Sequence, residues 1–361
     1  MIMLDQLLDS CVYHEGSDLH IKADSPPLVR IHGDLLPLDM DPLSPEETRM
    51  LSLSVLTETQ RARFDEELEL DFAYEIKGLS RFRGNVFMQR GNVGSAFRVI
   101  PYKIRTIEEL NLPDVCRQFC ERPRGLVLVT GPAGSGKSTT QAAMIDYINK
   151  KFPLHVITVE DPIEFVHTDQ QALVNQRELD TDTLAFPMAL RQALREDPDV
   201  ILIGEMRDLQ TIELAITAAE TGHLVFGTLH TTDAVQTVDR AIDVFPTHKQ
   251  QQIRMQMAVN LLGVVSQTLI KRKDGQGRVA AFETLVAIPA VRNMIREAKT
   301  HQIASLIETG QRSGMQTLDQ SLAHLVLSGE VTYEDALAKA ANVREFQALV
   351  GKMPDEDEPA A

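Results

Sequence analysis

The sequence predicts an α/β protein with a smaller α+β domain ahead of the α/β part. Four short apolar runs lie at 125–130, 155–159, 200–203 and 224–228, and segments with helical spacing separate them. Continuous apolar runs separated by helices are typical of a parallel sheet with helices on both faces. Before residue 100 the pattern is different, with short strands, a hairpin and amphipathic helices.

The elements expected before residue 100 follow from local signals. Four apolar residues with helical spacing open the chain: Leu4, Leu7, Leu8 and Val12. Short strands at 18–22 and 28–32 flank two prolines, and Ser44 with Glu47 forms the capping box of a further helix. Residues 81–90 alternate like a strand, turn at 91–94 and return over 95–100. We therefore expect a helix, two strands, a second helix and a hairpin.

These patterns divide the chain into five regions. We expect a first domain at 1–100, a flexible linker at 101–112 and a phosphate-binding core at 113–270. A mostly helical region is expected at 271–350, because the β-type runs give way to helical spacing after about residue 249. The last segment, 351–361, is acidic and is expected to be disordered.

Composition limits the partners and the compartment. The net charge of -16 argues against a protein that wraps nucleic acid. The three cysteines include no CxxC pair, so neither a disulfide framework nor a structural zinc site is indicated. The chain shows neither a signal peptide nor an apolar run long enough to span a bilayer. We expect a cytoplasmic protein without direct membrane insertion, whose contact with a membrane is through a protein partner.

A phosphate-binding loop follows the first apolar run. It reads Gly131, Pro132, Ala133, Gly134, Ser135, Gly136, Lys137 and Ser138, with Thr139 next. This fits G-x-x-x-x-G-K-[ST] between a strand and a helix, where backbone N–H groups and the helix N-terminus bind phosphate. Lys137 is expected to reach the β- and γ-phosphates, and Ser138 to offer its hydroxyl to Mg²⁺. ATP and Mg²⁺ are the expected cofactors.

Carboxylates and histidines follow the later strands. Glu205 ends the run 200–203 and can hold the Mg²⁺ shell or orient water, although a helix-capping role is the alternative. Residues 159–164 bring three carboxylates to the same edge of the sheet, and the residues alone do not say which one acts. His223 and His230 lie at the two ends of the last strand, where they are either structural or reporters of the γ-phosphate.

Together these segments resemble the secretion ATPases of the type II, type IV pilus and type IV secretion superfamily. Walker A, the Asp box (158–164), the Walker B stretch (194–208) and the His box (221–231) stand in family order. Within the superfamily the chain is similar to the type IV pilus retraction ATPases, the twitching motility proteins. Their signature AIRNLIRE appears as AVRNMIRE at 290–297. Assembly and secretion ATPases generally carry a tetracysteine insertion and a longer N-terminal region, and this chain has neither.

The resemblance implies an architecture and a set of roles. It implies a homohexamer in which each chain has a PAS-like domain, a RecA-like P-loop domain and a helical C-terminal extension, with ATP between the two domains. Glu205 would be the Walker B glutamate, Glu164 the acting Asp-box carboxylate, and His230 a catalytic His-box residue. Arg81, Arg83 and Arg98 would contact phosphates like arginine fingers, the alternative being a solvated hairpin face. Gly84, where many relatives have Val, is expected to loosen this hairpin.

Three functions remain open from the sequence. The first is a motor that retracts pili by acting on a membrane-embedded platform protein, and the second is an assembly, secretion or DNA-transfer ATPase. The third is a weakly hydrolysing accessory that works beside a paralogous retraction ATPase. A further hypothesis concerns Arg292, Arg296 and Lys299, which form one basic stripe on the helix expected at 289–299. The stripe is either a docking surface or a solvated helix face.

Overall fold

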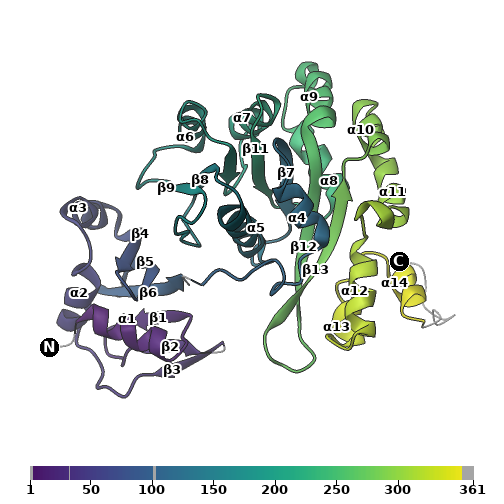
Figure 1. Ribbon diagram of the computed structural model, residues 1–361. Helices are drawn as coiled ribbons and strands as arrows, with labels where there is room; N and C mark the ends of the chain where they lie inside the picture. Colours follow the sequence, from purple (N-terminus) through teal and green to yellow (C-terminus); the bar gives the residue numbers. More distant parts are fainter. Residues whose placement is uncertain (1–2, 32, 101–102, 352–361) are drawn as a thin grey trace. The chain divides into compact units, whose positions relative to one another are not determined.

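The computed structural model describes residues 3–31, 33–100 and 103–351. It divides into two compact units, one made of Met1–Lys103 with Glu164–Val166 and the other of Ile104–Ile163 with His167–Ala361 (Figure 1). Among the residues described, no helix combines the length and the apolar character that crossing a membrane requires. The α/β class with an α+β domain ahead of it is confirmed.

The first unit is an antiparallel sheet of order β3-β2-β1-β6-β5-β4. Its strands are β1 (Asp18–Ile21), β2 (Leu28–Ile31), β3 (Asp34–Pro37), β4 (Glu69–Ile76), β5 (Ser80–Gln89) and β6 (Asn92–Ile100). Its helices are α1 (Leu4–Tyr13), α2 (Pro45–Leu53) and α3 (Glu58–Glu67). Side chains from all three helices share one apolar core with the inner face of the sheet, where Phe82 and Phe97 are fully buried.

Local signals placed the elements of this unit well. The Ser44 hydroxyl accepts the Glu47 N–H at 3.2 Å, and the Glu47 carboxylate accepts the Ser44 N–H at 2.8 Å, so the predicted capping box is confirmed. The hairpin turn is tighter than predicted. Arg90 and Gly91 have φ of 50° and 80°, which is typical of a two-residue type I′ turn, and β6 starts directly at Asn92.

Gly84 lies on the core face of β5, opposite Phe72 on β4. A Cβ at this position would come within 2.5 Å of the Phe72 ring, so the ring occupies the space of the missing side chain. The expectation that this glycine loosens the hairpin is therefore wrong, because the space is filled from the neighbouring strand.

The second unit contains a seven-stranded sheet of order β13-β12-β7-β11-β10-β8-β9. Its strands are β7 (Gly125–Thr130), β8 (His155–Glu160), β9 (Leu173–Glu178), β10 (Val200–Ile203), β11 (Leu224–Leu229), β12 (Leu261–Lys271) and β13 (Arg278–Val286). The four predicted strands form its centre and pair in parallel. Only β13 runs antiparallel to its neighbour. The predicted parallel sheet is thus confirmed in its centre and is extended on both sides.

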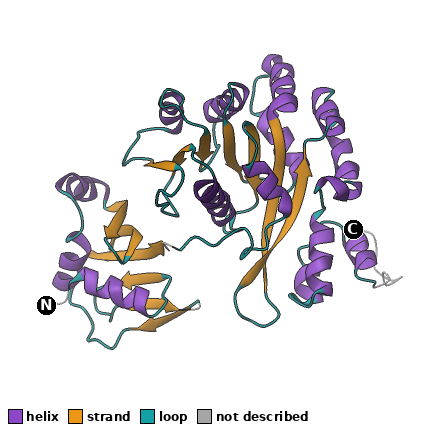
Figure 2. Ribbon diagram, in the orientation of Figure 1, coloured by secondary structure: helices purple, strands orange, loops and turns teal. Residues whose placement is uncertain are grey.

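Helices cover both faces of this sheet (Figure 2). They are α4 (Asp114–Cys120), α5 (Lys137–Lys151), α6 (Phe186–Ala193), α7 (Leu209–Glu220), α8 (Ala234–Asp243), α9 (Thr247–Asn260), α10 (Pro289–Arg296), α11 (Ile303–Thr309), α12 (Leu318–Leu327), α13 (Tyr333–Leu337) and α14 (Val343–Leu349), with two 3-10 turns at Thr300–Gln302 and Gln311–Ser313. Leu126 and Leu128 share a core with α6 to α11, whereas Val127 between them packs with α4 and α5. Successive side chains of β7 thus point into two different apolar cores, one on each face of the sheet.

The expected boundary at 270/271 is wrong. It falls inside the β12–β13 hairpin, whose nine cross-strand pairs run from Gly263↔Val286 to Lys271↔Arg278. The helices α12, α13 and α14 pack against three side chains at the outer part of this hairpin, Ile270, Val279 and Ala281. The C-terminal helices therefore rest on the strands that complete the ATPase sheet.

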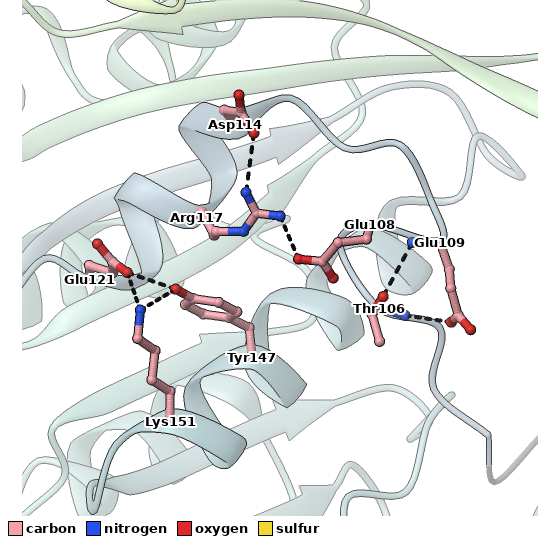
Figure 3. Close-up of polar contacts among 8 residues, drawn as sticks. All are labelled: Thr106, Glu108, Glu109, Asp114, Arg117, Glu121, Tyr147 and Lys151. Atoms are coloured by element: carbon pink, nitrogen blue, oxygen red, sulfur yellow. Dashed lines mark hydrogen bonds and ion pairs between the residues drawn. The ribbon is translucent and has the colours of Figure 1, made fainter.

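Much of the expected linker also belongs to the second unit. Ile107 and Leu112 are buried in the core formed by α4 and α5. Figure 3 shows the polar contacts that hold this segment: Thr106 and Glu109 exchange backbone and side-chain hydrogen bonds, and Arg117 on α4 binds Glu108. The expected linker 101–112 is therefore wrong for 104–112. Positions 101–102 and 352–361, which include most of the expected acidic tail, lie outside the described residues.

The predicted basic stripe on α10 is also different in the structure. The Arg292 guanidinium is partly buried and donates hydrogen bonds to the carbonyls of Ala287, Ala258 and Leu261 at 2.7, 3.0 and 3.0 Å, as well as to that of Val259. These carbonyls lie at and beyond the C-terminal end of α9 and before α10. The helix expected at 289–299 ends at Arg296, so Lys299 lies beyond it. Arg296 and Lys299 are exposed, but the Arg292 guanidinium is bound to these carbonyls, so the three side chains do not form the stripe that helical spacing predicted.

Candidate active site

The phosphate-binding loop connects β7 to α5, as predicted. Gly131, Gly134 and Gly136 have φ of 139°, 73° and 89°, a region that residues with a Cβ rarely enter. A Cβ on Gly131 would come within 2.3 Å of the Gln267 carbonyl oxygen, so the loop also passes too close to β12 for a larger residue. Ser138 and Thr139 follow in the first turn of α5. The backbone N–H groups of this turn supply the positive end of the helix dipole.

Lys137 is folded over its own loop. Its ammonium group donates to the carbonyl oxygens of Gly131 and Pro132 at 2.8 and 2.9 Å, and the residue is buried. Two buried polar atoms nearby, Ser135 Oγ and Gln141 Nε2, find no hydrogen-bond partner within the described part of the chain. Buried polar groups are rarely left unpaired, so these atoms favour a site for a polar ligand.

A cavity of about 340 Å³ adjoins the loop within the second unit. Gly136, Thr139 and Thr140 line it from the start of α5, and Leu112 lines it from the docked segment 104–112. Leu269 and Ala280 line it from the β12–β13 hairpin. The cavity combines apolar walls with the polar start of α5, which suits a ligand with an aromatic part and a charged part.

Glu205 follows β10, as predicted, and its carboxylate oxygen Oε1 meets two cationic or hydrogen-bonding partners. It lies 2.5 Å from Arg207 Nε and 2.9 Å from His230 Nε2. Burial alone would raise the pKa of Glu205, but the hydrogen bond and charge of Arg207, together with His230, lower it below its usual value. Glu205 is thus held as a carboxylate. His230, which the sequence also predicted as a site residue, is in hydrogen-bonding contact with it.

The other carboxylates and the second histidine occupy separate positions. Glu160 ends β8 and accepts hydrogen bonds from Thr158 at 2.7 Å and from Gln176 at 3.1 Å. Glu164 is exposed on the following loop and forms no hydrogen bond with the residues that the structure describes. His223 lies at the N-terminal end of β11, opposite to His230, and contacts the Ala218 carbonyl at 2.8 Å. The reporter role considered for His223 is therefore wrong, because it caps α7 at the other edge of the sheet.

The three arginines of the first unit lie on one face of its sheet. Arg83 and Arg98 are directly paired across β5 and β6, and Arg81 is two residues from Arg83. This face is opposite to the core side chains Phe82 and Phe97. Arg98 forms an ion pair with Asp18 at 2.9 Å, and Arg83 lies 3.8 Å from Asp71. The predicted common face is present, and contact with a phosphate remains a prediction.

Mg²⁺ fits the donor set of this site in chemical type. It prefers oxygen ligands, keeps several waters and needs few protein groups. In the described ranges, His, Cys, Asp and Glu form no group of three or more arranged to hold a metal ion. The Ser138 hydroxyl and the Glu205 carboxylate are the oxygens that would hold Mg²⁺ beside a nucleotide, where the ion would neutralise phosphate charge.

Sequence reasoning missed two polar residues of β12. The Ser266 hydroxyl lies 2.7 Å from that of Thr130, and Gln267 binds the phosphate-binding loop directly. Both are buried in a strand whose other buried residues are apolar or glycine. Three consecutive polar residues, 266–268, inside the otherwise apolar run GVVSQTLI were a signal that could have been noticed. It was lost because this region was expected to be helical.

Comparison with known proteins gives one consistent result. Residues 105–338 match the family model described as Type II/IV secretion system protein. The chain is 52% identical to the type IV pilus retraction ATPase PilT of Pseudomonas aeruginosa, over 93% of this chain and 98% of that protein. It is 53% identical to a twitching motility protein of Neisseria gonorrhoeae, over 88% of this chain and 84% of that protein.

A solved structure agrees with these relatives. The crystal structure of the pilus retraction motor PilT with bound ADP has a TM-score of 0.90 and 46% identity, and covers 96% of this chain and 99% of that one. The family match spans the phosphate-binding loop, Glu205 and the β12–β13 hairpin. The chain therefore belongs to the type II/IV secretion system protein family and is an ATPase of that family.

Proposed function

We propose that this chain hydrolyses ATP to drive the retraction of type IV pili, as a homohexameric motor. The observation that carries the proposal is the match to pilus retraction ATPases over almost the whole length of both chains. The loop with Lys137 and the carboxylate of Glu205, which the geometry keeps ionised, supply the parts that ATP hydrolysis needs.

The site suggests how the reaction proceeds. The N–H groups of the loop and of the start of α5 bind the phosphates. The Lys137 ammonium group leaves the carbonyls of Gly131 and Pro132 and binds the phosphates instead. The nucleoside occupies the cavity beside Gly136 and Leu269. Glu164 is the general base for water, Glu205 holds Mg²⁺ and His230 orients Glu205. Arg81, Arg83 and Arg98 bind phosphate and stabilise the transition state, as the resemblance to the family implies.

Coupling to the pilus involves further partners. ATP binding and release change the arrangement of the two units in each subunit, and sequential changes around the ring act on an inner-membrane platform protein. The chain is thus peripheral to the membrane and held there by the pilus machinery. Arg296 at the end of α10 and Lys299 just beyond it are the exposed cations that this contact would use.

The first experiment compares cells. A deletion strain should carry excess pili and lose twitching, and the unsubstituted gene should restore twitching while Glu205→Ala should not. Cells without pili would contradict retraction and indicate assembly. In purified protein, Lys137→Ala and Glu164→Gln should abolish steady-state hydrolysis. Arg81→Ala, Arg83→Ala and Arg98→Ala should lower it by about 10³-fold or more if they act as fingers, with ADP binding kept.

One relative favours a second candidate, an accessory ATPase. The type IV pilus ATPase PilU of Pseudomonas aeruginosa is 42% identical over 96% of this chain and 91% of that protein. An accessory protein would bind ATP but hydrolyse it slowly. The steady-state rate of the purified ring, measured beside Glu205→Ala, separates the two candidates: a rate no higher than that of the variant would favour the accessory.

A further inference from the structure

One side chain of β12 connects two parts of the phosphate-binding segment. The Gln267 amide nitrogen Nε2 donates to the Ser135 carbonyl at 2.6 Å, and its oxygen Oε1 accepts the Thr140 hydroxyl at 2.8 Å. Because a carbonyl can only accept, the nitrogen must face Ser135, and the Thr140 contact is consistent with the same orientation. Gln267 is 4% exposed, so water does not compete for these bonds.

The position of Gln267 is fixed by the sheet. β12 pairs in parallel with β7, with Ser266 beside Thr130, the last residue of β7. The two hydroxyls are also in contact at 2.7 Å. Gln267 is therefore the first residue of β12 beyond the paired end of β7, where the chain of β7 leaves the sheet to form the loop.

The planarity of the peptide bond gives this contact a consequence. In a trans peptide the C=O and the following N–H point in opposite directions. Since the Ser135 carbonyl points at Gln267, the N–H of Gly136 points away from β12. Gly136 has φ of 89°, and a glycine permits this peptide to rotate at little cost. A Cβ on Gly136 would come within 3.1 Å of Gln267 Nε2, so the amide also packs against the glycine.

We propose that Gln267 is a positioning residue for ATP hydrolysis, which fixes the Ser135–Gly136 peptide so that the Gly136 N–H is directed at the β-phosphate. The contact acts through the loop: Gln267 reaches the carbonyl side of the peptide, and the phosphate receives the N–H side. The proposal rests on nucleotide binding by this loop, as argued above. It assigns to β12 a role in the chemistry of the site besides its role in the sheet.

The test compares Gln267→Met with a matched control. Methionine keeps the shape of the side chain but cannot hold the carbonyl. Gln316→Met is the control, because Gln316 likewise donates to a backbone carbonyl, that of Phe282 at 3.1 Å, but does so away from the loop. The measurements are the dissociation constants of ADP and AMP by calorimetry, kcat and KM for ATP, and the melting temperature without nucleotide.

We expect Gln267→Met to weaken ADP binding about tenfold or more, which corresponds to one lost phosphate contact. AMP binding should change less than ADP binding, since AMP has no β-phosphate, although Gln267 also lines the cavity beside the loop. The KM for ATP should rise with the ADP constant and kcat should fall as well, because the loop holds the phosphates in the transition state too. Gln316→Met should change the melting temperature by a similar amount and neither affinity.

Two results would overturn the proposal: ADP affinity within threefold of the unsubstituted protein, or an equal loss for AMP and ADP. If Gln267→Met does not fold, Thr140→Val decides, because it removes the hydroxyl that orients the amide; it should weaken ADP about threefold or more, and an unchanged ADP constant would overturn the proposal. Failure of the proposed function looks different: an assembly or accessory ATPase would still lose ADP affinity in Gln267→Met, and only the cell phenotype or the steady-state rate would change, whereas a loop that binds no nucleotide would leave the unsubstituted protein without ADP affinity.

Discussion

Replacing Arg292 by methionine should destabilise the second unit far more than the same replacement at Arg296. Both arginines lie on α10, one turn apart, and a surface reading of the helix treats them alike. In the structure Arg292 donates to four carbonyls, two of which, those of Ala258 and Val259, belong to the last turn of α9. Arg296 is exposed and makes no hydrogen bond within the part of the chain that the structure describes.

The magnitude follows from these contacts. The last four carbonyls of a helix lack partners within the helix, and a cation there also interacts with the helix dipole. A hydrogen bond to a charged group contributes about 1.5–3 kcal/mol, but the four are not additive and Arg292 is partly exposed. We therefore expect Arg292→Met to cost about 2–4 kcal/mol, which corresponds to about 5–10 °C in the melting temperature. Arg296→Met should change stability by no more than about 0.5 kcal/mol.

The assay is thermal unfolding of the full chain without nucleotide, followed by calorimetry and circular dichroism. Arg292→Lys belongs in the series, because lysine keeps the charge but loses the planar fork that reaches several carbonyls, and should fall between the two methionine variants. Equal melting temperatures for Arg292→Met and Arg296→Met would refute the reasoning. The comparison also matters for function, since a charge reversal at Arg292 would test folding rather than docking.

Three further predictions concern the core of the first unit and the pH dependence of the free energy of unfolding. Gly84→Val should lower the free energy of unfolding by about 1–3 kcal/mol, as measured in urea, and less when Phe72 is replaced by leucine, because the new methyl groups collide with that ring. Burial, with Asp233 and Asp319 nearby, raises the pKa of Glu283 to about 7. The pKa of Glu283 is thus higher in the folded than in the unfolded protein, so this residue makes the free energy of unfolding fall as pH rises from about 4.3 to 7. Glu283→Gln should therefore reduce the difference in the free energy of unfolding between pH 5 and pH 8 by about 2 kcal/mol. Burial lowers the pKa of His167 to about 4, so the free energy of unfolding falls as pH drops from about 6.5 to 4. His167→Phe should make the free energy of unfolding depend less on pH in this range, as measured in the same series of pH values.

Local signals were sufficient for much of the fold. The capping box at Ser44 and the strand, loop and helix around Lys137 depend on residues close together in sequence, and both appear as predicted. The polar edge strand β9 was missed, because Leu173–Glu178 has too few apolar residues to be told from a loop. Its membership of the sheet depends on pairing with β8, which no local pattern expresses.

The residues of the candidate site also fall into those that local sequence predicts and those whose contacts depend on distant parts of the chain. Glu205 was predicted from its place after an apolar strand, but its contacts with Arg207 and His230 depend on how neighbouring strand ends meet. Gln267 was missed because it reaches the loop from 132 residues along the chain. Arg292 was misjudged for a related reason: helical spacing shows which side chains share a face, and does not show that a neighbouring helix ends beneath that face.

The β12–β13 hairpin sets where this protein can be divided for engineering. Within β12, Gln267 holds the phosphate-binding loop, and the outer part of the hairpin carries the last three helices through Ile270, Val279 and Ala281. A chimera joined at 270/271, where the sequence alone would place the junction, would take nearly all of β12 and the whole of β13 from different parents, so that eight of the nine cross-strand pairs would combine residues of both. A junction after Val286 would instead leave the hairpin intact. Parts exchanged between motors of this family should therefore include both strands or neither.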